Sequence, residues 1–161
     1  MLGPLTNPAG ANCQLLGVYA PELTEMFAQA LQGMGTRRAF IVHGHDGLDE
    51  ISLCAPTRIS ELNEGNIKTY DLSPDHYFSR TADLKDLSGG TPSENAAIAL
   101  GILKGEKGPK RDVVLLNAGA ALVVAGEAVD ITEGIRLAGE AIDSGAAEDK
   151  LQQLIQFTRQ A

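Results

Sequence analysis

The sequence predicts an α/β fold in which a mixed, largely parallel sheet is flanked by helices. Two apolar stretches, at residues 14–19 and 37–44, enclose an amphipathic segment at 22–35, which is the spacing of a strand-helix-strand unit. Short β-branched runs follow, and the second half of the chain is dominated by helical patterns. With 161 residues, 43% of them hydrophobic, the chain has the size and apolar content of one domain with a buried core.

The amphipathic segment has the period of a helix. Its apolar side chains recur at positions i, i+3, i+4, i+7 and i+8, and Pro21 stands at the first helical position. The segment ends near Gly33 or Gly35, which are typical helix-stop residues. Residues 37–44 combine β-branched and aromatic side chains and end in glycine. We therefore expect a strand that runs parallel to the first one after a right-handed crossover.

Three shorter runs follow and predict strands at the edge of the sheet. They cover residues 51–55, 57–62 and 66–72 and are separated by Pro56 and by an Asn-Glu-Gly turn signal. We expect antiparallel or mixed pairing among them. The next segment, residues 73–90, is polar and aperiodic, which indicates a long surface loop.

The rest of the chain predicts helices, two of them with clear start signals. Thr91 is followed three residues later by Glu94, and Asp130 by Glu133, which is the spacing of a capping box. One stretch, rich in alanine and glycine, is apolar on all sides and indicates a buried helix with close packing, and the alternative for it is a buried strand. The expected helices cover residues 91–106, 113–126 (the apolar stretch), 130–145 and 147–160.

The chain is acidic, which argues against a nucleic-acid surface. It has 13 Lys and Arg against 21 Asp and Glu, so its formal net charge is -8 at pH 7, and the basic residues are dispersed. An anionic ligand would therefore need a metal ion or backbone N–H groups. The sequence has no leader-like start and no apolar run of about 18 residues, so we expect a cytoplasmic protein without a membrane partner.

The cysteines and the histidine pair do not form a recognisable metal-binding pattern. Cys13 and Cys54 lie far apart and outside any CxxC spacing, so we expect reduced, buried thiols. His43 and His45 would face the same side at the end of a strand and could hold zinc, but no third ligand of matching spacing lies nearby. We therefore expect structural histidines.

The segment HGHDGLDE, residues 43–50, is the strongest candidate for chemistry. It follows a predicted parallel strand, and in α/β sheets ligands bind beyond the carboxyl ends of such strands. Asp49 and Glu50 are adjacent, and in a bent loop both carboxylates can reach one Mg²⁺ ion or two neighbouring ions, together with waters and a substrate phosphate. From spacing alone, an ordinary acidic loop is the alternative to a metal site.

Two glycine-containing loops are weaker candidates. In the opening GPLTNPAGA, Gly3 and Pro4 form a rigid turn with little side chain in the way of a ligand, and the alternative is a plain connector. The helix start GGTPSENAA offers backbone N–H groups for an anion, but Thr91 and Glu94 are already assigned to the cap. The sequence contains no P-loop, no dinucleotide-binding glycine pattern and no nucleophile elbow.

Several blocks together resemble the anthranilate phosphoribosyltransferase family. They are LGPLTNPAGA, QLLGVY before a Pro-Glu helix start, VHGHDGLDEIS, GGTPSENAA, and RDVVLLNA before a small-residue helix, and they stand in the family's order. The resemblance covers essentially all 161 residues and corresponds to the C-terminal half of that enzyme. It implies that residues 1–161 form the C-terminal α/β part of a phosphoribosyltransferase or nucleoside phosphorylase-like catalytic domain.

The resemblance also implies a reaction. In the family, the amine of anthranilate attacks C1 of 5-phosphoribosyl 1-pyrophosphate (PRPP), which gives N-(5-phosphoribosyl)anthranilate and pyrophosphate in tryptophan biosynthesis. The matching acidic pair is Asp49 and Glu50, which implies coordination of Mg²⁺ on the diphosphate. The matching opening block implies that Pro4 lines the anthranilate channel and that Gly3 belongs to the same loop.

Other parts of the family pattern precede the point where this sequence starts. They include the glycine-rich diphosphate loop and the N-terminal helical domain through which the family forms homodimers. We therefore expect no complete catalytic set in residues 1–161 and little or no turnover by the chain alone. Two alternatives stay open, namely a relative of the pyrimidine nucleoside phosphorylases and a non-catalytic binding module with the same fold.

Overall fold

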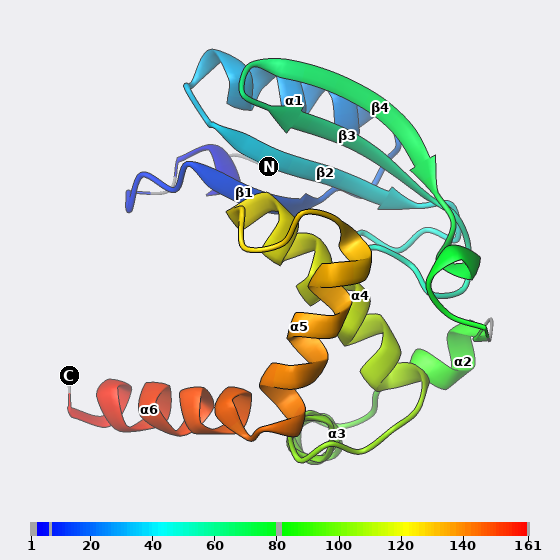
Figure 1. Ribbon diagram of the computed structural model, residues 1–161, viewed down its shortest axis with the longest axis vertical. Coiled ribbons are helices and arrows are strands. Elements are labelled where there is room, and N and C mark those ends of the chain that lie inside the picture. The colour runs from blue at the N-terminus through cyan, green and yellow to red at the C-terminus, as the bar shows by residue number, and fades with distance from the viewer. Residues whose placement is uncertain (1–2, 7, 80–81, 161) are drawn as a thin grey trace.

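A computed structural model of the chain describes residues 3–6, 8–79 and 82–160. A strand-helix-strand unit opens the fold, a β-hairpin completes the sheet, and helices form most of the remainder (Figure 1). The strands are β1 (Cys13–Gly17), β2 (Arg38–Gly44), β3 (Thr57–Asn63) and β4 (Asn66–Leu72). The helices are α1 (Glu22–Gly33), α2 (Leu84–Leu87), α3 (Pro92–Leu103), α4 (Pro109–Ala125), α5 (Ile131–Asp143) and α6 (Ala146–Gln160), with short 3-10 turns η1 (Gly3–Leu5) and η2 (Pro74–His76).

The sheet is mixed and has the strand order β1-β2-β3-β4. β1 pairs with β2 in parallel, with Cys13 opposite Arg38, because α1 provides the crossover that parallel strands need. β2 pairs with β3, and β3 with β4, in antiparallel fashion, since the chain turns back after each of these strands. The predicted α/β fold with antiparallel edge strands is confirmed. The expectation of a largely parallel sheet is wrong for the four described strands, because only the β1–β2 pair is parallel.

Helices cover both faces of the sheet. α1 packs on one face, where Leu31 and Ile41 belong to the same core cluster. α4 crosses the opposite face, as Figure 1 shows, and Leu116 joins the cluster that contains Phe40 and Val42. Successive residues of β2 therefore face two different cores. Full burial of each large apolar side chain contributes about 1.5–3 kcal/mol to the stability of the fold. This double coverage explains why the sequence of β2 is apolar almost throughout.

α4 and α5 pack closely because each has a glycine at the crossing. A Cβ at Gly119 would lie 2.7 Å from the backbone nitrogen of Ile135, and one at Gly134 would overlap the carbonyl oxygen of Gly119. Two backbones approach this closely only where the residues in contact lack side chains. The apolar stretch 113–126 is thus confirmed as a close-packed helix, and the strand alternative is wrong.

Both predicted capping boxes cap a helix, one completely and one in part. The Thr91 hydroxyl accepts from the Glu94 N–H, and the Glu94 carboxylate accepts from the Thr91 N–H at 2.7 Å. Asp130 likewise accepts from the Glu133 N–H at 2.8 Å. The Glu133 carboxylate, however, accepts from the N–H of Val129 and so caps the residue before the expected one.

Three details differ from the predictions. Residues 51–55 form an irregular, largely buried loop rather than a strand, because side chains bind their backbone N–H groups and Pro56 ends the run. Residues 73–90 are not all loop, since η2 and α2 lie within them. Pro21 precedes α1 as its N-cap and does not occupy its first position.

α3 and α6 lie at the end of the α4–α5 pair that is remote from the sheet (Figure 1). Every residue of α3 is exposed or only partly buried, although most of its side chains are apolar. α6 extends away from the body of the molecule, and its Leu154 and Phe157 side chains are 57% and 71% exposed. Both helices therefore present apolar side chains to solvent.

The two cysteines, Cys13 and Cys54, are free thiols as expected, but they are partly exposed rather than buried. Partial burial and the nearby charge of Asp46 raise the pKa of the Cys54 thiol, which favours its neutral form. Within the described residues, no helix combines the length and the apolar character that are needed to cross a membrane.

Candidate functional site

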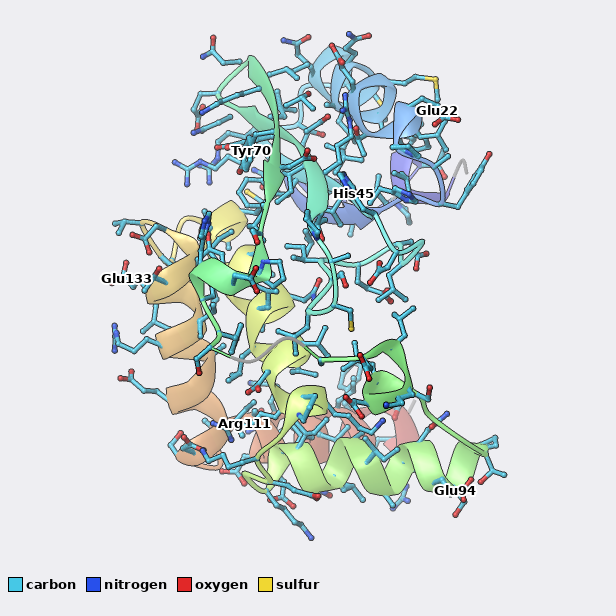
Figure 2. The ribbon with its side chains drawn as sticks, turned by 90° about the vertical axis from the view of Figure 1, so that its right-hand side faces the viewer. Glu22, His45, Tyr70, Glu94, Arg111 and Glu133 are labelled. Atoms are coloured by element: carbon cyan, nitrogen blue, oxygen red, sulfur yellow. The ribbon has the colours of Figure 1, made fainter. Side chains whose placement is uncertain are left out.

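The predicted acidic segment lies in a loop, residues 45–56, that connects β2 to β3. The His45 N–H donates to the Pro56 carbonyl oxygen at 2.9 Å, which closes the base of the loop and continues the pairing of the two strands. Figure 2 labels His45 at this base. The loop thus leaves the sheet and returns to it at one place, the carboxyl end of β2.

Asp49 and Glu50 also reach the end of β1. The Gly44 N–H donates to the Leu48 carbonyl oxygen at 2.7 Å, which turns the chain back directly after β2. Gly17, the last residue of β1, approaches so closely that a Cβ there would overlap the carbonyl oxygen of Asp49. The acidic pair therefore lies beyond the carboxyl ends of both parallel strands, which is where α/β sheets bind their ligands.

Side chains hold this loop in place of a β ladder. Asp46 accepts from the Leu48 N–H at 3.3 Å and from the Ser52 hydroxyl at 2.5 Å. The Ser52 hydroxyl oxygen accepts from the Cys54 N–H at 2.9 Å, and the Ser52 N–H donates to the Thr57 hydroxyl at 2.9 Å. Polar backbone groups in a largely buried segment are thereby satisfied without a strand.

Asn117 of α4 holds the residue that follows the acidic pair. Its Oδ1 accepts from the Ile51 N–H at 3.0 Å, and its Nδ2 donates to the Ile51 carbonyl oxygen at 2.8 Å. Ile51 itself is fully buried in the core between α4 and the sheet. Sequence reasoning missed Asn117, although it is the one polar side chain in the apolar stretch 113–126.

Asp49 and Glu50 are exposed carboxyl groups on neighbouring residues. Partial burial of Glu50, and then the negative charge of Asp49, raise the pKa of the Glu50 carboxyl above its ordinary value. A carboxyl that is harder to ionise because of a neighbouring acid is stabilised in its charged form by a cation. The electrostatics of the pair therefore favour a bound positive charge.

The donor set fits a Mg²⁺ ion that is shared with a substrate. Among the described residues, no group of three or more His, Cys, Asp or Glu side chains is arranged to hold a metal ion by itself. Mg²⁺ commonly binds through one or two carboxylates, with waters and substrate phosphates as its other ligands. Asp49 and Glu50 supply such carboxylates, so the residues present suit an open, substrate-bridged site rather than a closed protein cage.

The two histidines of the segment point to different partners. His43 is buried, and its Nδ1 lies 2.8 Å from the carbonyl oxygen of Val18, so this nitrogen carries the proton and donates it. His45 is exposed, and its Nε2 lies 3.2 Å from the Asp71 carboxylate on β4. The expectation of a structural histidine is confirmed for His43, whereas His45 forms a pair at the surface.

A cavity of about 380 Å³ opens beside Glu50. Its lining comes from the loop, from α2 and from α4, and consists of Leu48, Glu50, Leu87, Val113, Val114 and Asn117. Mostly apolar walls with a few polar groups are the usual composition of small-molecule sites. The sequence did not predict α2, whose start signal is Asp83 followed by Asp86, with aspartate in place of the usual Glu or Gln of a capping box.

Another cavity, of about 230 Å³, lies between the end of α3 and the start of α4. Lys107, Lys110 and Arg111 line it, but these cations already have partners. Lys107 and Arg111 pair with Asp143 at 3.2 and 2.8 Å, the latter as an ion pair rather than an aligned hydrogen bond, and Lys110 donates to a backbone carbonyl. Figure 2 shows Arg111 beside α3 and well separated from His45. α2 and α4 contribute to both cavities, with Asp86 and Lys110 here and Leu87 and Val113 in the cavity beside Glu50.

The opening turn at Gly3 lies away from the acidic pair. Gly3 is exposed at the start of η1, a Cβ there would have nothing within 4 Å, and its carbonyl oxygen accepts from the Thr6 N–H at 3.2 Å. The side chain of Pro4 is outside the described part of the chain. Leu5 lines a cavity with residues that precede β1 and β2, so η1 lies toward the amino ends of these strands. The acidic pair lies at their other ends.

Comparison with known proteins agrees with the blocks found in the sequence. The model of the glycosyl transferase family, a/b domain, matches residues 1–148. An anthranilate phosphoribosyltransferase of Desulfosudis oleivorans is 66% identical over 160 residues, which are 99% of this chain and 47% of that protein. The chain therefore spans about half the length of the curated relatives it matches.

Solved structures with the same fold carry the same name. The anthranilate phosphoribosyltransferase of Thermus thermophilus superposes with a TM-score of 0.89 at 44% identity, over 98% of this chain and 46% of that one. The enzyme of Saccharomyces cerevisiae in complex with PRPP and Mg gives a TM-score of 0.87 at 30% identity, over 99% of this chain and 46% of that one. Because the family model matches residues 1–148, which are most of the chain, the chain belongs to the glycosyl transferase family with this α/β domain.

Proposed function

We propose that the chain is the C-terminal α/β portion, residues 1–161, of an anthranilate phosphoribosyltransferase, and that Asp49 and Glu50 help to hold Mg²⁺ on the diphosphate of PRPP. One observation carries the metal assignment: an exposed carboxylate pair is fixed at the carboxyl ends of β1 and β2, beside a largely apolar cavity. The relatives support the choice of metal and substrate, because one solved structure contains PRPP and Mg together.

The proposed reaction joins anthranilate to the ribose of PRPP. A bond forms between the amine nitrogen and C1, the bond between C1 and the diphosphate oxygen breaks, the amine loses one proton, and pyrophosphate leaves. Mg²⁺, when bound, offsets the negative charge of the leaving diphosphate. Asp49 and Glu50 bind and orient that ion, which allows a chain of net charge -8 to accept a multiply anionic substrate.

We also propose roles for the opening turn and for a second subunit of the complete enzyme. The turn of Gly3 and Pro4 lines the anthranilate channel of the complete enzyme, as the opening block of the sequence implies, and this turn lies at the opposite ends of β1 and β2 from the acidic pair. The complete enzyme is a homodimer, joined through a helical domain outside residues 1–161, and acts in the cytoplasm without nucleic-acid partners. The acidic charge of the chain supports the last point, since phosphate backbones require clustered cations.

We expect the chain alone to have little or no activity, because the positioning of two substrates supplies a large part of the rate and the chain spans about half of its relatives. Loss of anthranilate fluorescence, with Mg²⁺ and PRPP present, is followed for the chain alone and for the chain mixed with the separately produced other half of the Thermus thermophilus enzyme. Activity is expected only in the mixture.

A double variant, Asp49→Asn with Glu50→Gln, tests the metal role in that mixture. Activity at limiting Mg²⁺ should fall by more than about tenfold. The matched control, Asp75→Asn with Glu127→Gln, removes the same charge from two exposed acids and should leave the activity unchanged. An unaltered magnesium dependence of the Asp49 and Glu50 variant would refute the metal role of these two residues. Full activity of the unmixed chain would refute the expectation that residues 1–161 lack part of the catalytic site.

The chain mixed with the other half of the enzyme also distinguishes the two alternative functions. Phosphorolysis of thymidine without consumption of anthranilate would identify a relative of the pyrimidine nucleoside phosphorylases. Binding of Mg²⁺ and PRPP without any turnover would identify a non-catalytic binding module.

A further inference from the structure

The residue after the acidic pair is held by a single side chain from another part of the molecule. Ile51 is fully buried and lies in an irregular loop, where its N–H and carbonyl are not part of a β ladder. Asn117 supplies a partner to each group, at 3.0 Å to the N–H and 2.8 Å to the carbonyl oxygen. The side-chain amide thus imitates the pair of hydrogen bonds that a neighbouring strand would make.

The donors of Asn117 are used within the protein. Its Nδ2 carries two hydrogens, of which one goes to Ile51 and the other to the Val113 carbonyl oxygen at 3.0 Å on the same helix. The orientation of the amide follows from these partners, because only the nitrogen can donate to two carbonyl oxygens. The side chain therefore acts on the loop and not on a ligand.

α4 is a rigid base for this contact. Leu116 and Ala120, which lie next to Asn117 in the helix, are fully buried against the sheet, and Gly119 packs against the backbone of α5. Asn117 is separated from Ile51 by 66 positions in the sequence. The core of the protein, rather than the loop itself, therefore sets the position of this anchor.

The acidic pair is fixed on both sides. β1 approaches the carbonyl oxygen of Asp49 through Gly17, and α4 holds Ile51 through Asn117. Glu50 lies between these two points, so the direction of its side chain depends on both of them. Glu50 and Asn117 also line the same cavity.

We propose that Asn117 is a positioning residue, which aims the Glu50 carboxylate at a divalent cation by holding both backbone groups of Ile51. This inference rests on the metal role proposed for the acidic pair. It adds that the geometry of the pair is controlled from α4, through a side chain whose donors are both used within the protein.

The test compares three variants of the 161-residue chain. Asn117→Ala removes both hydrogen bonds to Ile51, whereas Asn117→Asp keeps the shape and one acceptor but, as a carboxylate, cannot donate to the Ile51 carbonyl. Asn95→Ala is the matched control, because Asn95 holds Gly90 in the same way at the start of α3, accepting at 2.8 Å and donating at 3.2 Å.

Two measurements report on the variants. Relaxation of ¹⁵N nuclei gives the order of the Asp49, Glu50 and Ile51 amides. A titration with Mn²⁺ in the presence of PRPP, which supplies further ligands of the proposed site, is followed by electron paramagnetic resonance and gives a dissociation constant. In both Asn117 variants the order parameter of the Glu50 amide should fall from about 0.85 toward 0.6. The Kd for Mn²⁺ should rise by roughly tenfold or more, as for other residues that orient metal ligands. Asn95→Ala should match the parent chain in both measurements.

The outcomes separate this inference from the proposed function. A role in stability alone would lower the Tm of Asn117→Asp but leave the Glu50 order and the Kd unchanged well below that Tm, and this result would overturn the inference. Equal effects of Asn95→Ala and Asn117→Ala on the Kd would overturn it as well. If the parent chain bound no Mn²⁺ even with PRPP present, while the Asn117 variants loosened Glu50, the metal role would be wrong and the positioning of Glu50 would be supported.

Discussion

Glu50 and Asp143 are exposed acids whose surroundings shift their pKa values in opposite directions. Partial burial and the neighbouring Asp49 raise the pKa of Glu50, so the folded state disfavours its charged form. The ion pair with Arg111 and the hydrogen bond from Lys107 lower the pKa of Asp143, so the folded state favours its charged form. Ionised Glu50, which is placed to bind a ligand, therefore lowers the stability of the folded state, whereas ionised Asp143 raises it.

The pH dependence of unfolding should separate Glu50→Gln from Asp143→Asn. Ionised Glu50 destabilises the fold at neutral pH, and this effect disappears as the pH falls below its ordinary pKa of 4.5. Ionised Asp143 stabilises the fold above its ordinary pKa of 3.8, and this effect is lost as the pH falls through the lowered folded value. At pH 7, Glu50→Gln should raise the Tm and Asp143→Asn should lower it.

Thermal unfolding of both variants between about pH 3 and pH 7 checks this prediction. Each difference from the parent chain should shrink toward zero at the acid end. The two variants serve as controls for each other, because each removes one negative charge. Shifts of the same sign at neutral pH would show that net charge, rather than the local surroundings, decides the effect.

At this scale, the sequence revealed the acids but not what holds them. Asp49 and Glu50 could be predicted because they are adjacent and follow a recognisable strand. The roles of Gly17 and Asn117 depend on contacts with residues that are remote in the sequence, 66 positions away in the case of Asn117. No local pattern contains that information, although a single asparagine in an apolar helix is a useful signal.

The crossing of α4 and α5 depends on glycine in both helices. Gly134→Ala should destabilise the protein by about 1–3 kcal/mol, because the new Cβ would overlap the carbonyl oxygen of Gly119 and the two helices would have to separate. Gly139→Ala, in the same helix, is the control. Its Cβ would meet only ordinary contacts at 3.9 and 4.0 Å, so it should stabilise the helix by about 0.5–1 kcal/mol. Urea unfolding measures both free energies, and equal values would refute the role of the crossing.

The elements that the sequence predicted best are those with signals inside the element. Thr91 and Asp130 cap α3 and α5 as predicted, because a cap is a contact between near neighbours. The loop at 51–55 has the composition of a strand, yet side chains such as Ser52 and Thr57 take its hydrogen bonds, so composition alone gave the wrong element. α2 was missed because it has only four residues.

The whole molecule combines a covered sheet with two poorly covered helices. Both faces of the sheet are packed, by α1 and by α4, and the strongest candidate site lies at one end of it. α3 and α6 lie at the far end of the molecule and present apolar side chains to solvent (Figure 1). Because the chain spans about half of its relatives, we expect these faces to be contact surfaces in the complete protein.

In isolation, the chain should therefore associate with itself. Exposed apolar patches drive association in water, and Leu154 and Phe157 of α6 are 57% and 71% exposed. Analytical ultracentrifugation should show species larger than the 16.9 kDa monomer as the concentration rises. The double variant Leu154→Gln with Phe157→Gln should shift the distribution toward the monomer, whereas Gln152→Ser with Gln156→Ser, on the same helix, should not.

The same experiment shows what the association means. Addition of the other half of the Thermus thermophilus enzyme should convert the self-associated species into a complex of defined size, because that half would cover the same apolar side chains. Larger species that persist unchanged after this addition would place the self-association at another surface. A monodisperse monomer at every concentration would show that the exposed faces of α3 and α6 are compatible with water, and the reason for their apolar composition would then have to lie within the chain itself.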